Sequence, residues 1–186
     1  MSVLVLCLGL LSGCNNEGFE YNDYHCNLTI DNSKHLNITL ASAMDAMTPG
    51  VFCTIRYAIT DGVTYFVFSN NYGDQSKSMF NAIDENLQSH RRIGMNNGLI
   101  VGFGNLDSPP LFYAYDLQCP NCFDLEAIPV RSYPLDVKGS GVASCAKCKR
   151  SYNLNTGGNI VSGDKGSPLK PYRAATSGPN GVLRVY

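Results

Sequence analysis

Between residues 119 and 148 the chain reads Cys119-Pro120-Asn121-Cys122, then residues 123–144, then Cys145-Ala146-Lys147-Cys148. Each motif places two residues between its cysteines. This spacing lets a tight turn direct both thiolates and several backbone N–H groups at one ion, so two such turns facing each other would build a tetrahedral cage of four sulfurs. We therefore predict one metal site with the ligands Cys119, Cys122, Cys145 and Cys148.

Four thiolates suit more than one chemistry. Zn²⁺ is favoured because a closed sulfur cage needs no redox activity, and an all-cysteine [2Fe–2S] cluster is the alternative. A closed cage leaves no ligand position for water, so we expect a non-catalytic protein with a binding or structural role. A third interpretation is thiol–disulfide chemistry in an oxidising compartment. An oxidoreductase of that kind would need a helix after its motif, and no helical pattern follows Cys122.

The start of the chain has the pattern of an export signal. Residues 3–11 are almost wholly apolar, which is too short for a membrane-spanning helix of about 20 residues but right for a signal peptide. The run ends in Leu11-Ser12-Gly13-Cys14, which resembles the lipobox of bacterial lipoproteins. That resemblance implies a signal peptide over residues 1–13, lipidation of Cys14 and a polar tether over residues 14–23.

The lipid would hold the protein in the cell envelope, on the periplasmic face of the outer membrane or at the cell surface.

The composition makes other partners less suitable. The net charge is -1 and 16% of residues are charged, so the sequence shows neither the basic stripe of a nucleic-acid-binding protein nor a polybasic patch that would hold anionic lipid. We therefore expect a membrane partner and no nucleic acid, and the sequence names no protein partner.

Residues 24–186 are predicted to form a single, mainly β domain. The 18 Gly, 9 Pro, 11 Tyr and 8 Phe favour short strands joined by tight turns. Alternating apolar and polar residues predict strands, and the Asp61-Gly62 turn signal predicts a hairpin over residues 51–68. The expected strands cover residues 24–30, 36–40, 51–57, 63–68, 99–103, 111–116 and 181–186, with a loop over 70–78 and a short surface helix over 79–90.

Two further cysteines fall within predicted strands. Cys26 and Cys53 both lie on the face expected to point into the core. If the two strands are neighbours, an oxidising compartment would allow a disulfide between them. Two separate buried thiols fit the same pattern.

The last part of the chain resembles a Rieske domain. In that family a strand leads into a Cys-Pro loop, a second loop supplies another ligand pair, and a run rich in Gly and Pro closes over the metal. The matching segments are Tyr113-Ala114-Tyr115-Asp116 before Cys119-Pro120, the Gly-Pro-rich run from Gly163 through Gly166-Ser167-Pro168-Leu169-Lys170-Pro171-Tyr172 after the second motif, and the final strand Gly181-Val182-Leu183-Arg184-Val185-Tyr186.

The resemblance implies an antiparallel β-sandwich with a metal-knuckle subdomain over residues of about 117–152. Rieske clusters place two histidines on one iron, whereas this chain has cysteine at all four ligand positions. Its only histidines, His25, His35 and His90, lie outside both motifs. The first motif is instead similar to a rubredoxin or zinc-ribbon knuckle.

Overall fold

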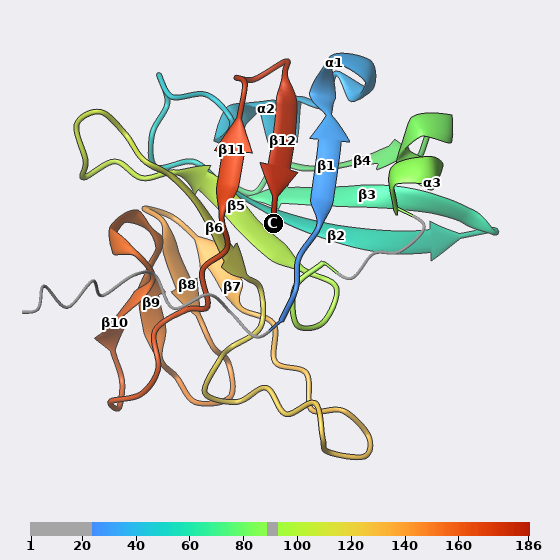
Figure 1. The fold of residues 1–186 in the computed structure, drawn as a ribbon. Coiled ribbons are helices and arrows are strands. Elements are labelled where there is room, and N and C mark those ends of the chain that lie inside the picture. Colours follow the sequence, from blue (N-terminus) through green and yellow to red (C-terminus); the bar gives the residue numbers. More distant parts are fainter. Residues whose placement is uncertain (1–23, 89–92) are drawn as a thin grey trace, which may run out of the picture.

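The structure, a computed structural model, describes residues 24–88 and 93–186. The predicted signal peptide, Cys14, the tether and His90 lie outside these residues. The fold contains three antiparallel sheets and a few short helices, which confirms the prediction of a mainly β protein (Figure 1). No helix within the described part of the chain is long and apolar enough to cross a membrane.

The largest sheet has five strands in the order β4-β3-β2-β5-β6. In chain order these are β2 (Phe52–Thr60), β3 (Val63–Asn70), β4 (Gln75–Met79), β5 (Leu99–Phe103) and β6 (Phe112–Asp116). Strands β2 and β3 form the predicted hairpin, with Thr60 paired to Val63. Asp61 and Gly62 at its turn have φ angles of 52° and 78°, and positive φ at both central residues matches the right-handed twist of paired strands.

A three-stranded sheet covers one face of this large sheet. It joins the two ends of the described chain in the order β1-β12-β11, with β1 (Leu28–Asp31), β11 (Ala174–Thr176) and β12 (Val182–Val185). Its apolar residues, including Leu28 and Leu183, share one core with Ile55, Phe66 and Phe68 of the large sheet. The two sheets therefore pack face to face around a common core.

Three short helices lie at the periphery, α1 (Asn32–His35), α2 (Ile38–Ala43) and α3 (Ala82–Gln88). The predicted surface helix over 79–90 is confirmed by α3. The predicted strand over 36–40 is wrong, because α2 begins there. Asn37 caps this helix by accepting a hydrogen bond from the Leu40 N–H at 3.0 Å, and local capping outweighs the alternating pattern.

The predicted loop over 70–78 is also partly wrong. Its second half is the edge strand β4, which pairs with β3 from Ser69 opposite Gln75 to Tyr65 opposite Met79. Residues in β4 alternate between exposed and half-buried, and four of the five are polar. An edge strand of this kind is held mainly by backbone pairing, so it carries no apolar pattern.

A small separate unit, which we call the cysteine module (residues 117–170), is inserted between β6 and β11. Its sheet has the order β10-β9-β8-β7, with β7 (Asp136–Lys138), β8 (Val142–Ser144), β9 (Ser151–Asn153) and β10 (Asn159–Ser162), and a 3-10 turn η1 (Leu154–Thr156) follows β9. The module packs on the second face of the large sheet, where Phe52, Ile100 and Tyr115 join its core.

The buried carboxyl group of Asp116 ties the module to the sandwich. It accepts hydrogen bonds from the backbone N–H groups of Met95 and Gln118 and from the hydroxyl of Tyr172. Burial raises the pKa of this carboxyl, and the three donors oppose that shift. A Cβ at Gly94, whose φ is 68°, would collide with the carboxyl. The chain thus leaves and re-enters the sandwich at one hydrogen-bonded junction.

The predicted disulfide between Cys26 and Cys53 is wrong, because both side chains are free thiols. Cys26 precedes β1, which pairs with β12, whereas Cys53 lies in β2 between β3 and β5. The two cysteines are therefore not on neighbouring strands, as the prediction required. Each is buried in the sandwich core, and burial raises the pKa of each thiol to about 12.

Alkylation tests this assignment. At pH 8 in the native protein, Cys26 and Cys53 should resist iodoacetamide, because the thiolate is scarce at a pKa of about 12 and the sulfurs are covered. After unfolding without reductant, mass spectrometry of the digest should find both residues alkylated. A peptide pair joined through the two cysteines would contradict the structure.

Candidate metal centre

The first motif forms a tight turn at the start of the cysteine module. The backbone N–H groups of Cys122 and Phe123 both donate to the carbonyl of Cys119, at 3.1 and 2.9 Å. The Cys119 N–H donates to the carbonyl of Tyr133 at 2.9 Å, which fixes the turn to the chain segment leading to β7. Both cysteines of the motif are thereby directed to the same side.

The second motif forms the turn between β8 and β9. The N–H of Cys145 donates to the carbonyl of Arg150 at 2.9 Å, and the N–H of Lys149 donates to the carbonyl of Cys145 at 3.0 Å. Lys149 adopts a left-handed conformation with φ of 60°, which reverses the chain after Cys148. A hairpin turn therefore presents Cys145 and Cys148 towards the first motif.

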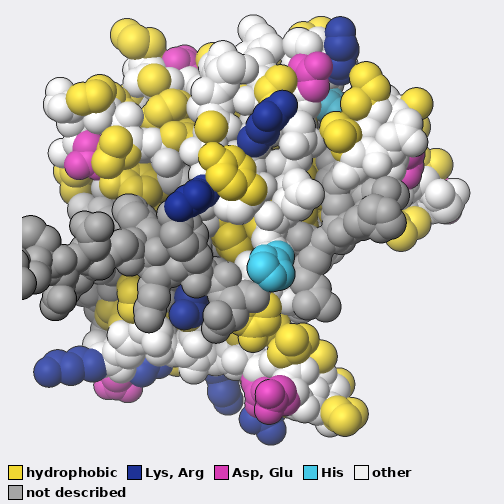
Figure 2. All heavy atoms as spheres, viewed as in Figure 1, with side chains coloured by type: hydrophobic (Ala, Val, Ile, Leu, Met, Phe, Trp, Pro, Cys, Tyr) yellow, Lys and Arg dark blue, Asp and Glu magenta, His cyan; other side chains and the backbone are white. Residues whose placement is uncertain are grey.

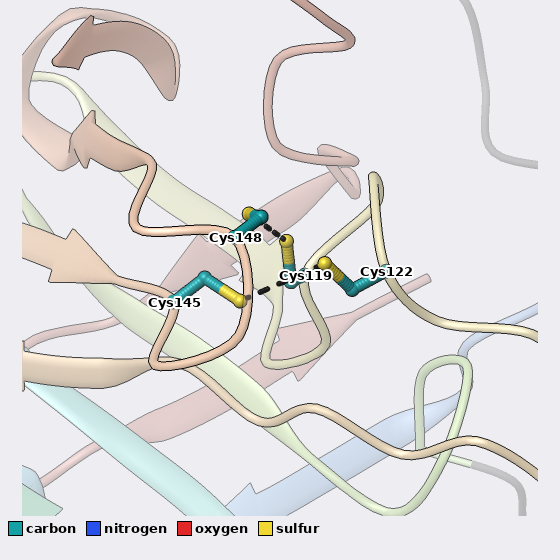
Figure 3. Close-up of side chains that lie close together, drawn as sticks. All are labelled: Cys119, Cys122, Cys145 and Cys148. Carbon is teal, nitrogen blue, oxygen red and sulfur yellow. Dashed lines mark hydrogen bonds between the residues drawn. The ribbon is translucent and has the colours of Figure 1, made fainter. Parts of the chain in front are cut away.

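The two turns bring all four sulfurs together, with every pair of Sγ atoms within 4.8 Å (Figure 3). The Sγ atoms of Cys119 and Cys148 are 3.7 Å apart, and those of Cys122 and Cys145 are 3.9 Å apart. A tetrahedron built from Zn–S bonds of 2.3 Å has S···S edges of about 3.8 Å. The predicted ligand set is thus assembled, with two of its six Sγ separations close to the edge of that tetrahedron and none above 4.8 Å.

The four thiols sit in unequal surroundings. Burial raises the pKa of Cys119 to about 11, although the Tyr152 hydroxyl and the Asn121 N–H oppose the shift. Burial and neighbouring thiols raise the pKa of Cys122 further. Burial would also raise the pKa of Cys148, but the N–H and guanidinium of Arg150 outweigh it and lower the value to about 6. Holding four thiolates side by side requires a compensating positive charge, which a divalent cation supplies.

A buried tyrosine supports the first motif from within. The hydroxyl of Tyr152 lies 3.3 Å from the Sγ of Cys119, and it accepts a hydrogen bond from Asn121 Nδ2 at 2.9 Å. Because the oxygen accepts from Asn121, its own proton is free to point at the sulfur. Such outer contacts orient metal ligands and tune their basicity.

Residues 163–168, which we call the covering loop, lie against both motifs. Asn121 exchanges two hydrogen bonds with the backbone of Ser167, at 2.8 and 2.9 Å. The guanidinium of Arg150 donates to the carbonyls of Asp164 and Lys165, each at 3.0 Å. The segment expected to close over the metal therefore docks on one residue from each turn, Asn121 and Arg150.

Sequence reasoning identified the four sulfurs, and Arg150 as a cation beside the second motif, but not the hydrogen bonds that support the site. Asn121 and Arg150 stand inside or beside the motifs, and Tyr152 lies four residues after Cys148. Their roles depend on contacts between distant residues of the module, which no local sequence pattern predicts. Of the described histidines, His25 is exposed, and His35 is buried with Nε2 3.1 Å from Oδ2 of Asp84. Neither belongs to the sulfur cage.

Comparison with known proteins gives no relative from which a function could be transferred. No family model matches the chain, and neither the curated proteins nor the solved structures contain a match. The geometry of the four-cysteine site is therefore the basis for inferring a function.

The change Tyr152→Phe removes the hydroxyl beside Cys119 and should weaken the affinity of the four-cysteine site for a divalent metal ion by about 10- to 100-fold, the usual cost of losing an outer-shell contact. Competition with a chromophoric chelator measures this affinity. Tyr133→Phe is the matched control, because Tyr133 packs on the same core and its hydroxyl makes no hydrogen bond recorded among the described residues. Equal metal affinities in the two variants would show that the Tyr152 hydroxyl does not contribute to the site.

Proposed function

We propose that this chain is a membrane-anchored, non-catalytic lipoprotein of the bacterial cell envelope, with one structural Zn²⁺ in its cysteine module and a binding or structural role. The observation that carries the metal assignment is the mutual distance of the four sulfurs, all within 4.8 Å. The ion would be held by the four cysteines of the two turns, Cys119, Cys122, Cys145 and Cys148.

The sulfur spacing favours a single ion over a two-iron cluster. In an all-cysteine [2Fe–2S] cluster two thiolates bind each iron, so sulfurs on different irons are farther apart than sulfurs on the same iron. In a mononuclear tetrahedral site all six separations are alike. The 4.8 Å limit on every pair, with two cross-motif pairs at 3.7 and 3.9 Å, supports the mononuclear arrangement. Electron transfer by a [2Fe–2S] cluster is therefore the less favoured function.

Disulfide chemistry is also less well supported. A disulfide needs an S–S distance of about 2.05 Å, whereas the closest recorded pair is 3.7 Å apart. Residues 123–135, which follow the first motif, contain no helix. This differs from the strand-to-helix setting of a redox-active Cys-x-x-Cys motif.

Zinc would act by completing the fold of the module. Residues 117–135 contain no extended strand and pair only through isolated bridges, Gln118 with Pro134 and Asp124 with Arg131. The strands of the module have only three or four residues each. A bound ion supplies the cross-link that these short elements lack, and with four protein ligands it has no open position for a substrate.

The finer fold assignment belongs to the same proposal. We propose a Rieske-like sandwich with a rubredoxin-like or zinc-ribbon-like knuckle subdomain. Three features support it: the insertion of the module between β6 and β11, the presence of one Cys-x-x-Cys turn on each of two loops, and the docking of the covering loop on both turns. The absence of histidine from the cage separates this site from a His-ligated Rieske cluster.

Elemental analysis tests the metal assignment, using protein purified without a metal-affinity column. We expect about one zinc per chain and an X-ray absorption spectrum with four sulfur neighbours near roughly 2.3 Å. Cys145→Ser should lower the zinc content and speed hydrogen exchange over residues 117–150, because metal binding and loop folding are one equilibrium. The strands β2 and β3 should stay protected.

Cys26→Ala is the control for this experiment, since it removes a cysteine that lies outside the cage. It should keep the full zinc content. Detection of iron with inorganic sulfide would instead support an electron-transfer protein. Metal-free protein with two disulfides would contradict both metal assignments.

The anchor is tested separately by Cys14→Ala. If diacylglycerol is attached to this thiol, the native protein should sediment with membranes after a carbonate wash and carry a lipid mass, whereas the variant should carry none. Cys26→Ala again serves as the control and should remain lipidated. Absence of lipid on Cys14 of the native protein would contradict the lipid anchor. It would not affect the metal assignment.

A further inference from the structure

An ordered loop projects from the cysteine module with apolar side chains in solvent. Residues 123–131 form this loop, closed at its base by two backbone hydrogen bonds between Asp124 and Arg131, at 2.9 and 3.1 Å (Figure 1, yellow-orange, lower right). Its apolar tip consists of three residues whose exposed fractions are 39, 100 and 44%, Leu125, Ile128 and Val130. Exposed apolar side chains on an ordered projection are typical of a contact surface.

The base of the loop lies where the chain enters the domain. The ring of Phe123 packs edge-on against the ring of Tyr24, with centroids 6.1 Å apart. Tyr24 is the first described residue and lies ten positions after Cys14. Ten extended residues reach at most about 33–36 Å, so a lipid on Cys14 would keep the base of the loop within that distance of the bilayer.

The charge of the chain is divided unevenly between the module and the rest. Residues 117–170 contain seven Lys and Arg against four Asp and Glu, a formal charge of +3. Two of the four acidic residues, Asp124 and Glu126, lie within the loop. The remaining residues contain seven against eleven, or −4, so the net charge of -1 conceals a cationic module. Lys and Arg side chains lie along the lower edge of the molecule, with some acidic side chains among them (Figure 2). The exposed lysines of the module include Lys147, Lys149 and Lys165.

We propose that the apolar tip enters the interfacial layer of the membrane and that the exposed lysines of the module face anionic lipid headgroups. The inference rests on the proposed lipid anchor at Cys14. A lipid bilayer is favoured over a protein partner because the anchor holds this loop at a high effective concentration next to the membrane. Apolar side chains combined with basic residues are the usual composition of an interfacial contact.

The chain contains no tryptophan, so a single substitution creates a unique fluorescent reporter. Lipidated Ile128→Trp protein is reconstituted in phosphatidylglycerol vesicles whose acyl chains carry bromine. Its emission should shift to shorter wavelength and fall by about twofold or more, because a tip buried 5–10 Å deep meets the brominated chains. Ile38→Trp is the matched control: Ile38 is 81% exposed and begins α2, at the opposite end of the molecule (Figure 1), and its emission should not change.

Co-sedimentation with the vesicles separates the possible failures. Protein that sediments while the Ile128→Trp emission stays unquenched would overturn the tip contact and leave the anchor standing. Protein that does not sediment would overturn the anchor and the tip contact with it. Quenching should be weaker on neutral phosphatidylcholine vesicles, and equal quenching would exclude the lysines from the contact. An unquenched tip that cross-links to an envelope protein would assign the loop to a protein partner.

Discussion

Burial of both faces of the five-stranded sheet is the constraint on which the rest of the structure depends. Strands β2 and β5 carry apolar residues on each side, so that Phe52 and Ile100 face the cysteine module while Cys53 and Val101 face the three-stranded sheet. A sheet with two apolar faces requires two covers. The N-terminal and C-terminal strands provide one, and the inserted module provides the other, which places the sulfur cage against the sheet.

The two halves of the molecule are held by different forces. The sandwich is built on the long strands β2 and β3, of nine and eight residues, and on a continuous core in which Phe66 contacts the rings of Phe68, Phe80 and Tyr57. The module has strands of three or four residues and long loops, so apolar burial alone supplies less to it. Four thiolates around one ion would offset this shortage by joining the two turns, while Tyr152 and the covering loop hold the ligands in place. Local stability in the module would then follow metal occupancy, whereas the sandwich would not depend on it.

The module and the sandwich also differ in the charge and the exposed apolar residues of their surfaces. The module carries the excess positive charge, the exposed apolar tip and the contact with Tyr24, where the chain enters the domain. The sandwich and the terminal residues carry the negative charge. If Cys14 bears a lipid, these features together give the domain a preferred orientation, with the module towards the membrane and the sandwich away from it. A rigid, metal-held module would then set the distance and angle of the sandwich relative to the bilayer.

The sequence by itself determined the features that depend on neighbouring residues. Period-two alternation identified six of the twelve strands in the described residues and missed β4, β11 and the four strands of the module. Asp61-Gly62 identified the hairpin turn, and the Cys-x-x-Cys spacing named the four sulfurs. Each of these signals is encoded within a few consecutive positions. The tertiary structure alone decided that the two turns face each other, that β4 pairs at an edge, and that Cys26 and Cys53 stay separate thiols. It also placed Tyr152 beside Cys119. These outcomes depend on contacts between residues distant in the chain, whose energies are set by packing and backbone pairing rather than by local pattern.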